Sequence, residues 1–231
     1  DEVMALNLVA EIDGPVSVRN VLMSVSDKTG LETFVSGLVA ACPDVKIYST
    51  GGTYAVVRKM LGEEEARERL VAVSDYTGQP EMQGGLVKTL DFKIYLGLLS
   101  ETYNEAHRQD LERAHAVAID MVVVNLYPFK QTVARAGVTP EEARTNIDIG
   151  GPCMVRASAK NYLRVASVTD PADYGDLLQE LGSNNGCLAL GTRLRLMKKA
   201  FAHTAAYDNA IAEYFAGVKV AAVQSLYNVR V

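Results

Sequence analysis

Short runs rich in β-branched residues alternate along the chain with longer stretches in which apolar residues recur every three or four positions. Within residues 29–42, Leu31, Phe34 and Leu38 share one face of a helix. The run 121–124 is continuously apolar, as expected of a buried strand. This alternation predicts an α/β fold, with a mainly parallel sheet flanked by helices and a helical C-terminal extension.

The pattern also sets the expected boundaries of the elements. Strands are expected at residues 19–25, 45–49, 70–74, 93–99, 119–126 and 164–168. Helices are expected at residues 29–42, 53–61, 101–115, 151–161, 170–181 and 192–215, with one more beginning after Thr139. Thr29 and Glu32 have capping-box spacing, and Thr139 precedes a proline at N1 and a glutamate at N3. We expect one domain over residues 19–216, preceded by a loosely packed lead-in at 1–18 and followed by a tail at 217–231.

Composition narrows the classes of partner. The 231 residues are 48% hydrophobic and 22% charged, as in a globular protein with a core of normal size. A formal net charge of -5 argues against a general attraction to nucleic acid or to an anionic membrane. No apolar run approaches the ~20 residues of a membrane helix. Cys42, Cys153 and Cys187 show neither metal-ligand spacing nor a disulfide framework, which predicts a cytoplasmic protein without a metal site.

Two loops have the composition of a phosphate cradle. Residues 24–30 and 49–53 follow predicted strands and combine small hydroxyl side chains and glycines with Lys28 at a predicted helix start. Backbone N–H groups at a helix N-terminus bind anions, and ligands of open α/β sheets bind beyond the carboxyl ends of the strands. Each loop alone is also compatible with an ordinary cap or turn. Together, on neighbouring strands, they favour a phosphate monoester.

Three more polar segments complete the candidate chemistry. They are residues 87–89, 125–129 and 146–152, which contain Lys88, Tyr127 and Asp148 respectively. A lysine, a tyrosine and an aspartate in one site could perform acid–base chemistry. The residues alone therefore indicate a phosphorylated small molecule and proton transfer without a metal or redox cofactor.

Eight segments in order resemble IMP cyclohydrolase, the N-terminal half of the bifunctional purine biosynthesis enzyme. They are SVSDKTG at 24–30, STGGT at 49–53, VSDYTGQPEM at 73–82, VKTL at 87–90, VVVNLYPF at 122–129, NIDIGGP at 146–152, AKN at 159–161 and AFAHTAAYD at 200–208. The resemblance implies a fold like that of methylglyoxal synthase. It also implies a hydrolase of cyclic amide bonds that acts in the ring-closing direction. Such an enzyme converts 5-formamido-imidazole-4-carboxamide ribotide to IMP with loss of water, the last step of de novo purine synthesis, and needs no cofactor.

The resemblance also implies roles for individual residues. Lys88 would stabilise the developing oxyanion, and Tyr127, Asp148 and Lys160 would orient the carboxamide and move protons. The 5′-phosphate would be held by Ser26, Lys28, Thr50, Gly51, Gly52, Thr53 and Thr89. The base would be contacted by Asn125, Ile149 and Gly150.

The chain departs from the family pattern after residue 85. Leu86 replaces an arginine that helps to grip phosphate in relatives, and Asp91 and Tyr95 replace two histidines. Because a dianion seldom lacks a second cation, we expect Lys93 or Arg156 to compensate. The proposed chemical residues are unchanged, which favours an active enzyme.

Two other functions remain open at this stage. A methylglyoxal-synthase-like lyase would explain the fold and the phosphate loops but not the segments at 146–152 and 159–161. A purine-nucleotide-binding module without turnover would explain the substitutions at 86–96. In the preferred interpretation the substrate is a small purine ribonucleotide, the protein is a homodimer, and a separate formyltransferase supplies the substrate.

Overall fold

Five parallel strands form the central sheet of the protein, in the order β4-β3-β2-β5-β6. The computed structural model describes residues 7–79 and 89–230. The register places Leu22 opposite both Tyr48 and Val122, so the sheet is built outward from β2. The strands are β2 (Asn20–Val25), β3 (Lys46–Ser49), β4 (Leu70–Ala72), β5 (Met121–Asn125) and β6 (Ala166–Val168). This confirms the α/β fold class with a parallel sheet.

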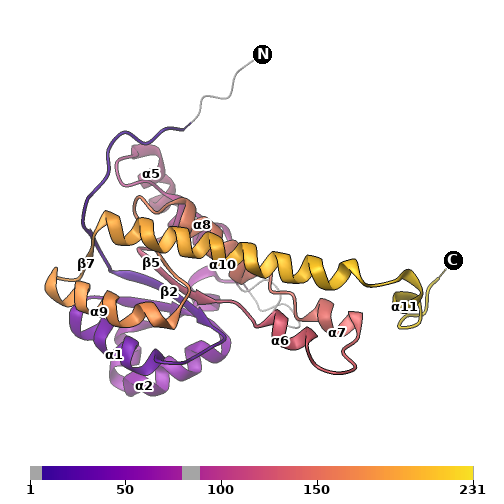
Figure 1. Cartoon of the computed structure of the whole chain (residues 1–231). Coiled ribbons are helices and arrows are strands. Elements are labelled where there is room, and N and C mark those ends of the chain that lie inside the picture. The colour runs from indigo at the N-terminus through magenta and orange to yellow at the C-terminus, as the bar shows by residue number, and fades with distance from the viewer. Residues whose placement is uncertain (1–6, 80–88, 231) are drawn as a thin grey trace, which may run out of the picture.

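Helices cover both faces of the sheet (Figure 1). They are α1 (Leu31–Ala41), α2 (Gly51–Arg69), α3 (Val73–Thr77), α4 (Phe92–Leu99), α5 (Glu105–Arg113), α6 (Phe129–Val133), α7 (Pro140–Thr145), α8 (Gly150–Lys160), η2 (Pro171–Asp173), α9 (Tyr174–Ser183), α10 (Leu190–Ala216) and α11 (Val220–Gln224). The helix α10 runs well past the sheet, and α6, α7 and α11 lie near its C-terminal half (Figure 1). No helix in the described residues is long and apolar enough to cross a membrane.

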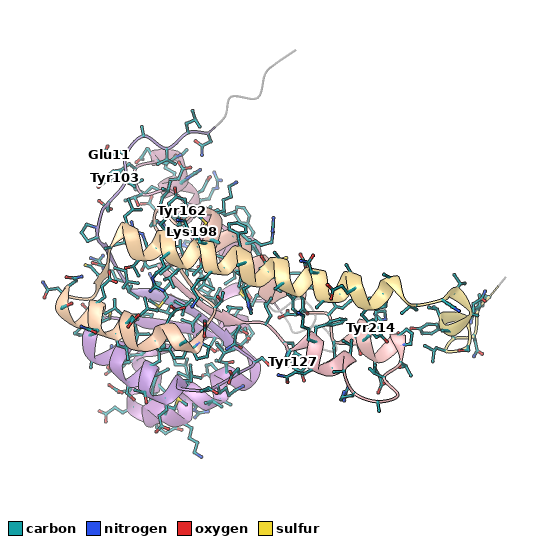
Figure 2. The ribbon with its side chains drawn as sticks, in the orientation of Figure 1. Glu11, Tyr103, Tyr127, Tyr162, Lys198 and Tyr214 are labelled. Carbon is teal, nitrogen blue, oxygen red and sulfur yellow. The ribbon has the colours of Figure 1, made fainter. Side chains whose placement is uncertain are left out.

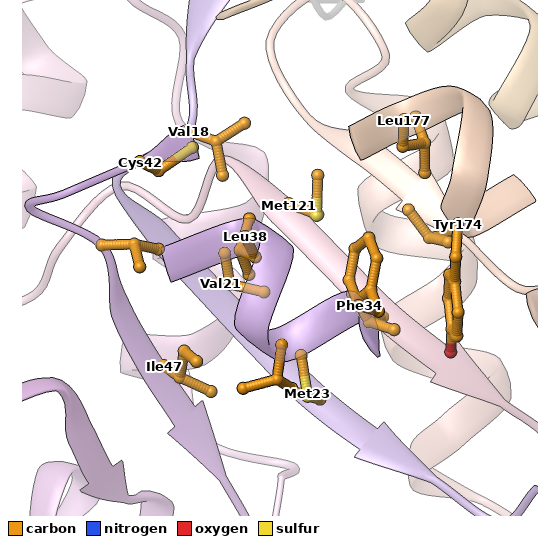
Figure 3. Close-up of a cluster of buried hydrophobic side chains, with 14 of the residues drawn as sticks. Val18, Val21, Met23, Phe34, Leu38, Cys42, Ile47, Met121, Tyr174 and Leu177 are labelled. Carbon is orange, nitrogen blue, oxygen red and sulfur yellow. The ribbon is translucent and has the colours of Figure 1, made fainter. Parts of the chain in front are cut away.

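Alternate residues of the central strands belong to two separate hydrophobic cores, one on each face of the sheet. Val21 and Met23 of β2 join the core beneath α1 and α9, where the rings of Phe34 and Tyr174 stack at 4.3 Å between centroids (Figure 3). Leu22 points the other way, into the core formed with α4, α8 and α10. A strand buried on both faces has no polar side to alternate with, which is why the runs in the sequence are almost purely apolar.

One predicted strand is wrong. Residues 93–99 form the helix α4, whose buried side chains Ile94, Gly97 and Leu98 have helical spacing. The side chain of Asp91 caps this helix by accepting a hydrogen bond from the Lys93 N–H at 2.8 Å. The short, mostly apolar run suggested a strand, but the cap and the packing against α8 decide the structure.

The capping predictions have opposite outcomes. Thr139 and Glu142 form a complete capping box at the start of α7, as predicted. The capping box at Thr29 is wrong, because the residue before α1 is Gly30 in a left-handed conformation (φ 68°), and Thr29 instead donates its hydroxyl to Asp27 at 2.7 Å. The helix α2 is also longer than expected, since it continues past a kink at Gly62.

The segment before the sheet is fastened by one buried arginine. Val16–Ser17 (β1) pairs antiparallel with Cys187–Leu188 (β7). The guanidinium of Arg193, only 1% exposed, donates to the carbonyls of Asp13 and Gly14 and to three others. The domain boundaries at residues 18 and 216 stay predictions.

Candidate functional site

A cavity of about 760 Å³ opens beyond the carboxyl ends of the neighbouring strands β3, β2 and β5. Its walls come from the loops after these strands and from the segment that leads into α8. All ten residues expected to bind substrate line it: Ser26, Lys28, Thr50, Gly51, Gly52, Thr53, Thr89, Asn125, Ile149 and Gly150. The sheet edge therefore brings together segments as far apart in sequence as Ser26 and Gly150.

The loop after β2 is shaped by Asn125 at the end of β5. The Asn125 side-chain oxygen accepts the backbone N–H groups of Ser26 and Asp27 at 2.7 and 2.9 Å. Its amide nitrogen donates to the Asp27 carbonyl at 2.8 Å. The Asn125 side chain thus holds the loop from the neighbouring strand.

A second contact fixes the start of α2 against the same loop. Thr53 is 4% exposed; its hydroxyl accepts the Val25 N–H at 3.0 Å and lies 3.2 Å from the Val25 carbonyl. Thr50 precedes α2 and provides no side-chain cap, so the first N–H groups of the helix are available to a ligand. These donors and the helix dipole favour an anion at this end of the cavity.

Lys28 brings a positive charge to the same end. Its ammonium group lies 3.2 Å from the Val25 carbonyl and 3.5 Å from the Ser26 carbonyl, at the base of the loop. Of the described residues that line the cavity, Lys28 is the only lysine or arginine. A phosphate here would meet one cation and a set of backbone donors.

Asp148 lies at the opposite wall, where α8 begins. Its Oδ1 accepts the Gly151 N–H at 3.0 Å, and a Cβ on Gly151 would displace the Asp148 carboxylate. Burial raises the pKa of the Asp148 carboxyl above its ordinary value, while the backbone N–H groups of Gly151 and Tyr127 oppose that shift. A carboxylate whose pKa is raised is a stronger proton acceptor once it is ionised.

Tyr127 and Thr89 complete this wall. Tyr127 follows β5 on the segment that leads to α6 (Figure 2) and lines the cavity with its side chain half-exposed. Thr89 is buried, and its hydroxyl oxygen would lie 2.6 Å from a Cβ on Gly150. A Cβ at either glycine before Pro152 would therefore force a side chain of the cavity wall to shift.

Of the proposed catalytic residues that the structure describes, Tyr127 and Asp148 line the cavity and Lys160 does not. Lys160 is exposed and is the last residue of α8, whose first residue, Gly150, lines the cavity. Ten residues of helix, about 15 Å, separate its backbone from Gly150, and Lys160 is not among the described residues that line the cavity. The expectation that it joins Tyr127 and Asp148 there stays a prediction. Lys88 and Leu86 lie outside the described residues.

Neither cation expected to compensate for Leu86 lines the cavity. The ammonium of Lys93 donates to the Tyr76 carbonyl at 3.2 Å and lies 5.4 Å from the centre of the Tyr76 ring. The guanidinium of Arg156 lies 5.6 Å from the centre of the Phe201 ring. Both charges have other partners, so the expected compensation finds no support.

The role of Tyr207 escaped the sequence analysis. Its hydroxyl accepts the backbone N–H of Asp148 at 2.7 Å, from a position 59 residues later in the chain. The only sequence signal was the segment at 200–208, which contains Tyr207 but carried no assigned role.

The fold and the cavity define the class: a parallel α/β protein with a cavity at the carboxyl edge of its sheet, one end of which has the donors and the positive charge suited to an anion. Two family models match, MGS-like domain over residues 30–153 and AICARFT/IMPCHase bienzyme over residues 158–230. The chain belongs to the MGS-like domain family, and its C-terminal part matches the bienzyme model.

Individual relatives extend this assignment. The chain is 49% identical over 196 residues to "Bifunctional purine biosynthesis protein PurH" of Enterococcus faecalis, which covers 85% of this chain and 36% of the relative. The PurH protein of Ruminiclostridium cellulolyticum is 45% identical, over 85% of this chain and 37% of the relative. The PurH protein of Magnetococcus marinus is 47% identical, over 87% of this chain and 36% of the relative. The chain thus spans little more than a third of these relatives. The crystal structure of ForH superposes with a TM-score of 0.69 at 32% identity, over 86% of this chain and all of that one.

Proposed function

We propose that this protein is an IMP cyclohydrolase that closes 5-formamido-imidazole-4-carboxamide ribotide to IMP. The observation that carries the proposal is one cavity that joins two anion-binding loops to Asp148 and Tyr127. The similarity to PurH over 85% of the chain supports the choice of substrate. The phosphate would lie against residues 26–28 and 50–53, and the base would extend towards Ile149 and Gly150.

The reaction forms one C–N bond and releases one water. The carboxamide nitrogen attacks the formyl carbon, the formyl oxygen becomes anionic, and the nitrogen must lose a proton. Asp148, whose pKa is raised by burial, would accept that proton. The oxygen takes up this proton and a second one from the formamido nitrogen, the C–O bond breaks to release water, and the C=N double bond of the new ring forms. Lys88 would stabilise the oxyanion, and Tyr127 would orient the carboxamide. Because an amide is a weak nucleophile, alignment and charge stabilisation would supply most of the acceleration.

A second copy of the chain would explain the role proposed for Lys160. Lys160 does not line the cavity of its own chain, and an assembly that brings it to another copy's site would let it move protons there. A homodimer, which we also propose, would permit this. Light scattering on the purified protein tests the dimer. We further propose that the protein acts in the cytoplasm and that a formyltransferase supplies the substrate.

The decisive experiment is incubation of the purified protein with the formylated ribotide while the absorbance of IMP is followed. Turnover supports the proposal, and IMP binding without turnover would instead support a nucleotide-binding module. Dihydroxyacetone phosphate is the matched second substrate, because its consumption would indicate a lyase. A nucleotide-bound structure with the phosphate away from residues 26–28 and 50–53 would contradict the assigned binding mode.

A further inference from the structure

The backbone of Asp148 is held by a tyrosine from the long C-terminal helix. The Asp148 N–H donates to the Tyr207 hydroxyl at 2.7 Å. Asp148 precedes α8, so helical hydrogen bonding offers no partner for this N–H. Tyr207 is 8% exposed, and its partner is partly buried, so water is a poor substitute for this bond.

The Tyr207 ring is itself fixed by an aromatic cluster. It meets the ring of Phe129 edge-on, with centroids 6.3 Å apart and planes at 71°. Phe129 also packs edge-on against Tyr214, at 6.1 Å and 83°. Phe129 is 1% exposed and lies two residues after Tyr127, so this cluster supports the segments that carry both Tyr127 and Asp148.

The Asp148 carboxylate depends on the same backbone. Its Oδ1 accepts the Gly151 N–H at 3.0 Å, and a Cβ on Gly151 would approach its Oδ2 to 2.3 Å. The carboxylate therefore has little room to adjust if residue 148 moves. A misplacement of about 1 Å in a reacting group can cost on the order of 100-fold in rate.

We propose that Tyr207 is a positioning residue for the cyclisation, which holds the Asp148 carboxylate in place through the backbone N–H of Asp148. This inference rests on the proposed function, because Asp148 is a proton acceptor only if that function is correct. Through Tyr207, the helix α10 would help to position a residue of the site. Tyr207 lies in the stretch matched by the bienzyme model, whereas Asp148 lies in the stretch matched by the MGS-like model. Burial raises the pKa of Tyr207, so its hydroxyl stays protonated at neutral pH.

The test compares Tyr207→Phe with Tyr214→Phe. Both changes remove a hydroxyl from the same aromatic cluster, but the Tyr214 hydroxyl makes no hydrogen bond with the described residues. In Tyr207→Phe we expect kcat to fall roughly 10–100-fold while KM stays at the parent value. The acidic limb of the pH profile should also move to lower pH, because a loosened carboxylate gains water and its pKa falls towards the ordinary value. Tyr214→Phe should match the parent in both respects.

Amide hydrogen exchange separates this inference from the proposed function. The Asp148 amide should be protected in the parent protein and in Tyr214→Phe, and should exchange faster in Tyr207→Phe. Unchanged exchange at Asp148 in Tyr207→Phe would overturn the positioning role, as would equal kcat losses in the two variants. If the parent does not cyclise the ribotide, the proposed function fails, while the exchange of the Asp148 amide still decides whether Tyr207 fixes this backbone.

Discussion

The carboxylate of Asp148 rests directly against the backbone of Gly151, with the Gly151 N–H 3.0 Å from Oδ1. This contact ties the proposed proton acceptor to the first turn of α8, where the helix dipole favours a negative charge. A side chain at residue 151 would therefore displace this carboxylate.

Gly151→Ala should therefore damage the site. The new Cβ would lie 2.3 Å from Asp148 Oδ2 and 2.9 Å from Leu126 Cδ2, so both side chains must move. We expect kcat to fall roughly 10–100-fold through misplacement of the carboxylate. The free energy of unfolding should fall by about 1–3 kcal/mol. The control is Gly191→Ala in α10, where a Cβ meets nothing within 4 Å and stability should rise slightly. Parent-like kinetics in Gly151→Ala would show that the carboxylate position is not critical.

Asp148→Asn should slow turnover and stabilise the fold. The asparagine oxygen can still accept the Gly151 N–H, but the side chain can no longer accept a proton. We expect kcat to fall at least about 100-fold, while IMP binding by calorimetry changes little. Arg108→Ala, on the exposed face of α5, is the control for turnover.

The effect of Asp148→Asn on stability should depend on pH with a defined sign. Burial raises the folded-state pKa of Asp148 above 3.8, so the folded state binds its proton more tightly than the unfolded state. The ionised carboxylate therefore weakens folding as pH rises through the folded-state pKa. The stability gained in Asp148→Asn should grow as the pH rises from about 4 through the folded-state pKa, and should level off above it, in urea titrations. A gain independent of pH would rule out desolvation of the charge as its cause.

Arg193→Met should destabilise the fold without a direct effect on the site. The fully buried guanidinium satisfies five backbone carbonyls, two of them in the segment before β1. In Arg193→Met these carbonyls lose their hydrogen-bond donor, which should lower the free energy of unfolding by about 3 kcal/mol or more. Arg195→Met is the matched control, because Arg195 is exposed and its partner Asp173 would still form an ion pair with Lys199. The free energy of unfolding should then fall by only about 0–1 kcal/mol. Similar urea midpoints for the two variants would contradict a stabilising role of the hydrogen bonds made by Arg193.

The sequence predicts the sheet well because its strands are buried on both faces. Residues such as Val21, Leu22 and Met23 must all be apolar, and no helical periodicity competes with that signal. For residues 93–99 the sequence predicts a strand instead of a helix, because so short an apolar run does not distinguish the two. The helix is determined by the Asp91 cap and by packing against α8. Gly30 rather than Thr29 stands at the N-cap of α1, and the Thr29 hydroxyl is bound by Asp27, a competition that spacing alone does not reveal.

The candidate site is predictable wherever it follows from the edge of the sheet. The loops after β2, β3 and β5 converge because parallel strands end at the same edge, so Lys28, Thr50 and Asn125 meet as expected. Lys160 is different, since its role came from resemblance and its distance from the site is set by the length of α8. The contact between Tyr207 and Asp148 joins two elements far apart in sequence, and no local pattern encodes it.

Thr53→Val should weaken nucleotide binding more than its effect on stability explains. The Thr53 hydroxyl accepts the Val25 N–H at 3.0 Å and so holds the start of α2 against the loop after β2. Valine keeps the shape but leaves this buried N–H unpaired, which should cost about 1–3 kcal/mol of stability. The matched control is Thr192→Val, which removes a hydroxyl that lies 2.6 Å from Glu180 at the start of α10, outside the cavity lining. We expect both variants to unfold at lower urea concentrations than the parent protein. Only Thr53→Val should lose affinity for IMP, by roughly tenfold, which corresponds to about 1.4 kcal/mol of binding free energy. Calorimetric titration with IMP provides the measurement, and equal affinities in the two variants would show that the bond between the loop and α2 does not shape the phosphate site.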